Sequence, residues 1–101
     1  MGATMKLTIQ QSTLLRVIAA APNGLWYPRD SPYVEGKQLL LGSTEVVTVS
    51  KALWRKGLAK QHAKLGPYAS WITDEGRRVA ELERGRPLAW ISQTWQQQQP
   101  R

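Results

Sequence analysis

The chain has 101 residues, of which 42% are hydrophobic and 21% charged, with no cysteine and a formal net charge of +7. This length suits one domain with a small core, and the mixed composition excludes wholesale disorder. Without cysteine there is no disulfide, thiolate metal site or cysteine nucleophile, and no stretch reaches the roughly 20 apolar residues of a membrane span. Because the first residues, MGATMKLTIQQS, lack the apolar segment of a signal peptide, we expect a cytoplasmic protein.

The positive charge is concentrated in one segment. Residues 46–73 contain five Lys or Arg and no Asp or Glu, whereas the rest of the chain, with nine basic and seven acidic residues, sums to only +2. A local excess of one sign favours a polyanion-binding surface over general solubility. We call these five cations the basic segment: Lys51, Arg55, Lys56, Lys60 and Lys64.

The first predicted element is a helix over residues 9–21. Thr8 and Gln11 have the spacing of a capping box, and a Pro-Asn-Gly sequence at residues 22–24 ends the apolar pattern. Its apolar stripe is wide enough to predict a core helix without chemistry of its own. A brief strand is predicted at residues 25–27, which are Leu, Trp and Tyr.

Residues 28–42 allow two interpretations. Ser31 followed by Pro32, with Gly42 as a stop, predicts a helix over residues 32–41. The three consecutive leucines at residues 39–41 equally suit a buried strand.

An amphipathic helix is predicted from Ser43 to Lys56, with Gly57 as its end. One face is apolar, with Val46, Val49 and Leu53. The opposite face is polar or cationic, with Thr44, Thr48, Lys51 and Arg55.

A β-hairpin and a further helix follow. Residues 58–63 and 68–73 are short segments joined by a turn-forming Lys-Leu-Gly-Pro sequence, and Lys60, His62 and Lys64 alternate onto one side of the first strand. Thr73 is a predicted cap for a helix over residues 74–84, where Arg77 and Glu81 have the spacing of an ion pair.

The C-terminal residues have helical spacing at Leu88, Ile91 and Trp95, with Trp90 adjacent. We interpret residues 1–87 as the domain, residues 88–95 as a helical extension that forms a homodimer contact, and residues 96–101 as a disordered Gln-rich tail. The alternative is that Trp90 and Trp95 fold back on the core of the same chain. For Trp26 and Trp71 we expect core packing, and Trp54 is either core edge or partner contact.

The segments "VSKALWRKGLAKQ" and "YASWITDEGRRVAEL" resemble the recognition helix and wing of winged-helix regulators of the MarR and PadR type. In those proteins a helix ends at Gly-Leu, the wing follows, and Leu-Thr-x-x-Gly begins the next helix. Here residues 57–58 and 72–76 occupy those places. The resemblance implies an α+β winged helix-turn-helix fold, with helix, short strand, helix, recognition helix, β-hairpin wing and C-terminal helix. MarR proteins are longer, and their ligand-sensing role is not carried over.

The resemblance also implies a DNA-binding site and a function. The recognition helix would enter the major groove, and the wing would contact the phosphate backbone. The implied site comprises Thr44, Thr48, Lys51, Arg55, Lys56, Lys60, His62 and Lys64. The function would be sequence-specific binding of double-stranded DNA by a bacterial, phage or plasmid transcription regulator, without a cofactor.

Other interpretations remain open. The polar helix face and the hairpin lysines also suit ordinary solvated surface, and the whole domain also suits a protein-interaction module, for example a phage protein that binds a host complex. Because the chain has a single histidine and no cysteine, we expect no metal site. The sequence contains no catalytic motif, so we do not expect an enzyme.

Overall fold

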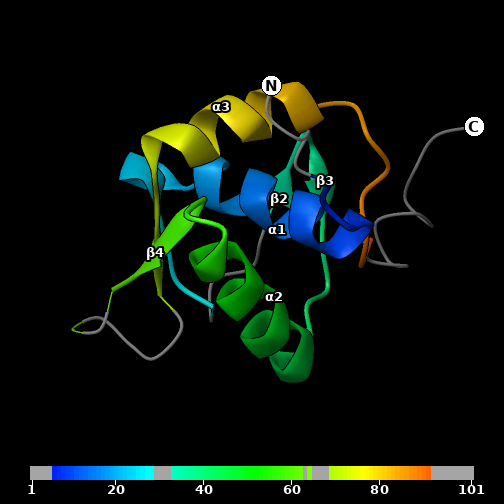
Figure 1. Cartoon of the computed structure of the whole chain (residues 1–101). Coiled ribbons are helices and arrows are strands. Elements are labelled where there is room, and N and C mark those ends of the chain that lie inside the picture. The colour runs from blue at the N-terminus through cyan, green and yellow to red at the C-terminus, as the bar shows by residue number, and fades with distance from the viewer. Residues whose placement is uncertain (1–5, 29–32, 63, 65–68, 92–101) are drawn as a thin grey trace, which may run out of the picture.

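The computed structural model describes residues 6–28, 33–62, 64 and 69–91, which form three α-helices and two small antiparallel sheets (Figure 1). This confirms the α+β class predicted from the sequence. In chain order the elements are α1 (Ile9–Ala20), η1 (Pro22–Gly24), β1 (Leu25–Trp26), β2 (Tyr33–Val34), β3 (Lys37–Gln38), α2 (Ser43–Arg55), β4 (Ala59–Gln61), β5 (Ser70–Ile72) and α3 (Asp74–Glu83).

Helix α1 is the centre of the core. It begins at the predicted capping box: the Thr8 hydroxyl accepts from the Gln11 amide at 3.0 Å, and the Gln11 side chain accepts from the Thr8 amide at 3.2 Å. Every residue from Ser12 to Ile18 is buried, because α1 lies between α3 on one side and α2 on the other (Figure 1). The prediction of a core helix is confirmed, and its end is one residue earlier than expected.

The three-stranded sheet has the order β1-β5-β4, with β5 antiparallel to both neighbours. The predicted β1 strand and the predicted hairpin are therefore confirmed. Successive side chains of a strand point to opposite faces. On the inner face, Trp26 and Ala59 are buried in the core, and Ser70 is fully buried beside them.

Residues 33–42 contain no helix, so the predicted helix over residues 32–41 is wrong there; Pro32 itself lies outside the described residues. Strands β2 and β3 instead form a hairpin in which Val34 pairs with Lys37. Its two turn residues, Glu35 and Gly36, have φ values of 52° and 80°, and two consecutive positive φ angles are incompatible with a right-handed helix. The buried-strand alternative fits Leu39 alone, which is 2% exposed.

A buried arginine fastens this hairpin to the rest of the molecule. The side chain of Arg16, on α1, is 2% exposed and forms an ion pair with Glu35 at 3.2 Å. Its guanidinium also donates to the backbone carbonyls of Arg86 and Pro87, each at 3.0 Å. One side chain thus joins α1, the β2–β3 turn and the segment after α3.

That last segment, residues 86–91, is named the C-terminal arm here, and its Leu88–Ile91 part is not helical, contrary to the prediction. The Ala89 amide donates to the Thr13 hydroxyl at 2.9 Å, and Ile91 forms a β-bridge with Leu39. These contacts hold the arm against the core, and the chain bends at Ala89 and Trp90, where Trp90 has a φ of 60°. A helix of so few residues would not be stable by itself. Trp95 and the Gln-rich tail lie outside the described residues.

The end of α2 and the start of α3 meet at a close backbone contact. Gly57, with φ 74°, ends α2 in a Schellman motif: its amide donates to Trp54, and the Leu58 amide donates to the Leu53 carbonyl, both at 3.1 Å. Thr73 caps α3 through the Gly76 amide at 2.9 Å and donates its hydroxyl proton to the Gly57 carbonyl at 2.8 Å.

A glycine is required at position 76. A Cβ there would lie 1.9 Å from the Leu58 carbonyl oxygen, closer than any van der Waals contact allows. The Gly-Leu sequence at residues 57–58 and the Thr-x-x-Gly sequence at residues 73–76 therefore contact each other. Together they fix the position of α3 relative to the end of α2 and the hairpin.

Candidate nucleic-acid interface

Helix α2 presents the polar face that its sequence predicted. Residues 44, 48, 51 and 55 follow one another at helical spacing, and all four are exposed: Thr44, Thr48, Lys51 and Arg55. The opposite face is buried against α1 and the sheet through Val46, Val49 and Leu53. The helix is thus fixed by its apolar side, and its hydroxyls and cations face outward.

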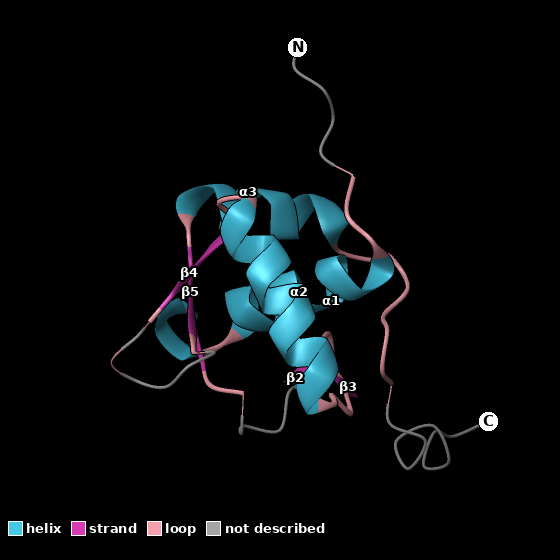
Figure 2. Ribbon diagram, turned by 60° about the horizontal axis from the view of Figure 1, so that its bottom comes forward, coloured by secondary structure: helices cyan, strands magenta, loops and turns pink. Residues whose placement is uncertain are grey.

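The hairpin of β4 and β5 lies beside α2 (Figures 1 and 2). The indole Nε1 of Trp54 on α2 donates to the Ser70 hydroxyl on β5 at 3.0 Å. This bond resolves the position of Trp54, which is half-buried and belongs to the contact between α2 and the hairpin.

The cations of the hairpin continue those of α2 along the chain. Lys56 is the C-cap residue of α2, and only the Gly57-Leu58-Ala59 connection separates it from Lys60 in β4. Lys56, Lys60 and Lys64 are exposed, and His62 is half-buried. Ala63 and residues 65–68 lie outside the described residues.

All five cations of the basic segment are exposed, and none forms an ion pair or hydrogen bond with a described residue. The nearest acid along the chain, Glu45, is half-buried in the first turn of α2, where a carboxylate suits the helix dipole. The positive charge of this region therefore has no internal carboxylate partner among the residues described.

On and just after α3, in contrast, most arginines form ion pairs with nearby glutamates. Arg78 pairs with Glu75, Arg84 with Glu81 at 3.1 Å, and Arg86 just beyond the helix with Glu83. Local ion pairing was predicted here, but the predicted partner was wrong: Glu81 pairs with Arg84, not Arg77. Hydrogen bonding to Arg78 lowers the pKa of Glu75, and the same bond raises that of Arg78.

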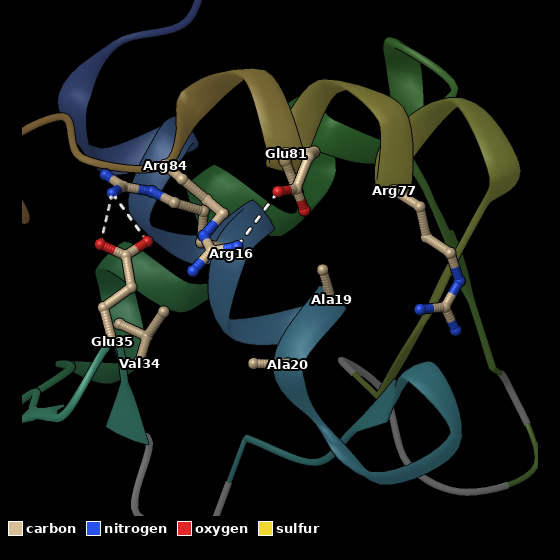
Figure 3. Close-up of a pocket in the computed structure, with 9 residues that line it drawn as sticks. Arg16, Ala19, Ala20, Val34, Glu35, Arg77, Glu81 and Arg84 are labelled. Carbon is tan, nitrogen blue, oxygen red and sulfur yellow. Dashed lines mark hydrogen bonds and ion pairs between the residues drawn. The ribbon is translucent and has the colours of Figure 1, made fainter.

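A pocket of about 420 Å³ lies between α1, α3 and the β2–β3 turn (Figure 3). Its floor is apolar, with Ala19, Ala20, Val34 and Ala80. Its polar groups are largely satisfied by one another, since Arg16 pairs with Glu35 and Arg84 with Glu81. Arg77 lies apart from Glu81 and forms no ion pair with a described residue (Figure 3).

The residues predicted to form a dimer contact pack on their own chain. Leu88, Trp90 and Ile91 are half-buried against the core, and the Leu40 amide donates to the Trp90 carbonyl at 2.6 Å. This is the arrangement expected if the segment folds back. The homodimer itself stays a prediction. In a homodimer, these three side chains would contact the partner only through the part of their surface that the core leaves exposed.

Two features of the structure were not predicted from the sequence. Arg16 lies within the helix predicted over residues 9–21 and was given no role there, although an arginine among the apolar residues of a core helix indicates a buried partner. Trp71 was expected in the core and is 38% exposed, because its strand position places it on the outer face of the sheet.

No protein family model, curated protein or solved structure matches this chain. Among the described residues, no helix is long and apolar enough to span a membrane, and no cluster of three potential metal-ligating side chains occurs. Function must therefore be inferred from the residues and geometry of the chain itself.

Proposed function

We propose that the protein binds double-stranded DNA sequence-specifically, as a small transcriptional regulator with a winged helix-turn-helix architecture. One observation carries the proposal: the five cations of the basic segment are exposed on α2 and the adjacent hairpin, and no described carboxylate neutralises them. Phosphate groups of DNA are the complementary partner for such a surface.

The arrangement of elements supports the same proposal. A polar helix precedes a β-hairpin, the hairpin is followed by a capped helix, and the first strand pairs with the second hairpin strand in the order β1-β5-β4. In a winged helix, α2 would be the recognition helix and β4–β5 the wing. In chain order the β2–β3 hairpin takes the place of the first helix of a helix-turn-helix, and β2 packs against α1, so this part departs from the winged-helix pattern.

The residues have separable roles in this proposal. Lys51 and Arg55 project from the middle and end of α2, where they would reach guanine O6 and N7 or phosphate, and Thr44 and Thr48 would contact base edges or backbone. Lys56, Lys60 and Lys64 would bind phosphates and set the position of the helix on the duplex.

A protein-interaction module is the second candidate, and a specific observation favours it. Three large apolar side chains are well exposed on other parts of the surface: Tyr33 (59%), Leu40 (73%) and Leu82 (70%). These side chains supply apolar surface that a protein partner would bury, whereas phosphate binding makes no use of it.

Salt dependence separates the two candidates. If all five cations meet phosphates, the logarithm of the association constant for a duplex should fall with the logarithm of salt concentration at a slope of about −4 to −5 per protomer. Fluorescence anisotropy with a labelled duplex over a salt series measures this slope. A slope near zero, or no binding at low salt, would contradict the DNA proposal.

A further inference from the structure

The outer face of the three-stranded sheet carries an exposed indole between a cation and an aliphatic side chain. Trp71, in the central strand β5, pairs directly with Lys60 of β4 on one side and with Leu25 of β1 on the other. Because paired residues project from the same face, these three side chains form a row across the sheet, opposite the buried Trp26 and Ser70. This row, with His62, is called the outer sheet face.

The indole of Trp71 is positioned but incompletely covered. The ring of His62 lies 5.0 Å from it, centroid to centroid, at an interplanar angle of 35°. Trp71 remains 38% exposed, whereas Trp26 is 3% exposed and Trp54 and Trp90 are half-buried. The exposed part of the Trp71 indole is therefore an apolar surface that does not pack in the core and is accessible to a ligand.

The surroundings of Trp71 indicate what would cover it. Lys60 is its direct neighbour, and the other cations of the basic segment precede and follow Lys60 along the chain without a described carboxylate partner. Aromatic rings beside unpaired cations are how proteins hold single-stranded nucleic acid: the ring stacks on a base while the cations bind phosphates. A base within a duplex is stacked on both sides, so only an unpaired base offers its face to the indole.

We propose that the outer sheet face binds an unpaired base of single-stranded DNA, with Trp71 as the stacking platform and Lys60 as the phosphate contact where the duplex meets the single strand. The preferred ligand would then be a duplex with a single-stranded extension, in which α2 holds the duplex and the sheet holds the extension. This inference rests on the proposed DNA-binding function and names the DNA structure that the protein selects.

The test compares a blunt duplex with the same duplex carrying an oligo-dT extension, at one fixed salt concentration, by anisotropy. For the wild-type protein we expect the extension to tighten binding by about 5- to 150-fold, the range for stacking one base on an aromatic ring. Trp71→Leu should remove the stacking part of that gain, leaving only the weaker contribution of the phosphate contacts, and should leave affinity for the blunt duplex unchanged. Trp71→Phe, which keeps a smaller ring, should retain part of it.

Two control variants separate this inference from the proposed function. Tyr33→Leu makes the same aromatic-to-aliphatic change at an exposed residue of the other sheet and should preserve the gain. Arg55→Ala should weaken the blunt and extended duplexes equally, so that their ratio is preserved. Thermal unfolding of each variant verifies that it is folded; should Trp71→Leu unfold, Trp71→Phe decides.

The outcomes are distinct. An extension that brings no gain to the wild-type protein, or a gain as large in Trp71→Leu as in the wild type, would overturn the assignment of the outer sheet face. A larger gain from an oligo-U extension than from oligo-dT would overturn the choice of DNA as its ligand. Failure of the blunt duplex to bind would contradict the proposed function instead, and the single strand alone, with and without Trp71→Leu, would still test the stacking platform.

Discussion

Two arginine- and lysine-rich regions of this molecule use positive charge in opposite ways. On the α1–α3 side, Arg16, Arg78, Arg84 and Arg86 each form an ion pair with a glutamate, and Arg77 is the arginine there that forms none with a described residue. On the α2–hairpin side, the five cations of the basic segment have no described carboxylate partner. Helix α1 separates α2 from α3 (Figure 1).

The difference teaches that net charge is a poor guide to a binding surface. Paired arginines contribute to local structure and present little free charge, whereas unpaired cations on a rigid face leave their field available to a partner. Mutations in the two regions should therefore affect different measurements: stability on one side and ligand binding on the other.

The largest expected effect is on the paired side, at Arg16. Arg16→Ala should lower the free energy of unfolding by about 3–5 kcal/mol, because it leaves Glu35 and the Arg86 and Pro87 carbonyls without their donor in a partly buried site. Urea denaturation followed by circular dichroism measures the change. Arg84→Ala, which breaks an exposed pair, is the matched control and should cost about 0.5 kcal/mol or less. Equal effects would show that burial does not distinguish the two pairs.

The next largest expected effect is on stability, at the close contact between Gly76 of α3 and the Leu58 carbonyl after α2. Gly76→Ala should destabilise the protein by about 3 kcal/mol, since the new methyl group overlaps the Leu58 carbonyl oxygen and α3 must shift away from the end of α2. Gly36→Ala is the control: it has a positive φ but no neighbour within 4 Å, so it should cost about 1 kcal/mol. Thermal unfolding compares them, and a Gly76→Ala protein as stable as the wild type would mean that this close approach is not maintained in solution.

Substitutions in the basic segment should change the affinity for DNA. Arg55→Ala should cost about 1–3 kcal/mol on the preferred DNA sequence and flatten discrimination among sequences, because a base contact is lost. Lys64→Ala should weaken binding to all sequences alike and reduce the salt slope by about one unit. Competition binding with a panel of duplexes measures both.

Arg84→Ala, on the paired side, should leave these binding measurements unchanged. If it weakened DNA binding as much as Arg55→Ala, the contrast between the two regions would fail. A sequence preference altered by Lys64→Ala but not by Arg55→Ala would place the recognition element elsewhere.

The smallest effect is on pH dependence at α3. The hydrogen bond from Arg78 lowers the pKa of Glu75 in the folded state, so this pair stabilises the fold above the unfolded-state pKa of the glutamate, and the contribution disappears as pH falls through the lowered, folded-state value. Arg78→Gln should raise the pKa of Glu75 toward its ordinary value, as measured by NMR titration of the Glu75 carboxyl carbon. Because both side chains lie on the surface, where solvent screens the pair, stability at neutral pH should scarcely change. An unaltered titration of Glu75 would contradict this pairing.

The sequence by itself determined the elements whose signals are local. The Thr8–Gln11 capping box, the amphipathic pattern of α2, the Gly57 stop and the Thr73 cap each depend on residues within one or two turns, so spacing alone predicted α1, α2, the hairpin and α3. The local charge excess likewise identified the candidate interface, because runs of one sign are visible without a fold.

Only the tertiary structure decided the features that depend on distant residues. The β2–β3 turn and the non-helical C-terminal arm are stabilised by Arg16, whose partners Glu35 and Arg86 lie 19 and 70 positions away in the chain. The exposure of Trp71 followed from the register of β5 between β1 and β4, since a shift of one residue would have buried it. Which cations were paired also depended on geometry, because Glu81 lies within reach of both Arg77 and Arg84 in sequence but binds only Arg84 among the described residues.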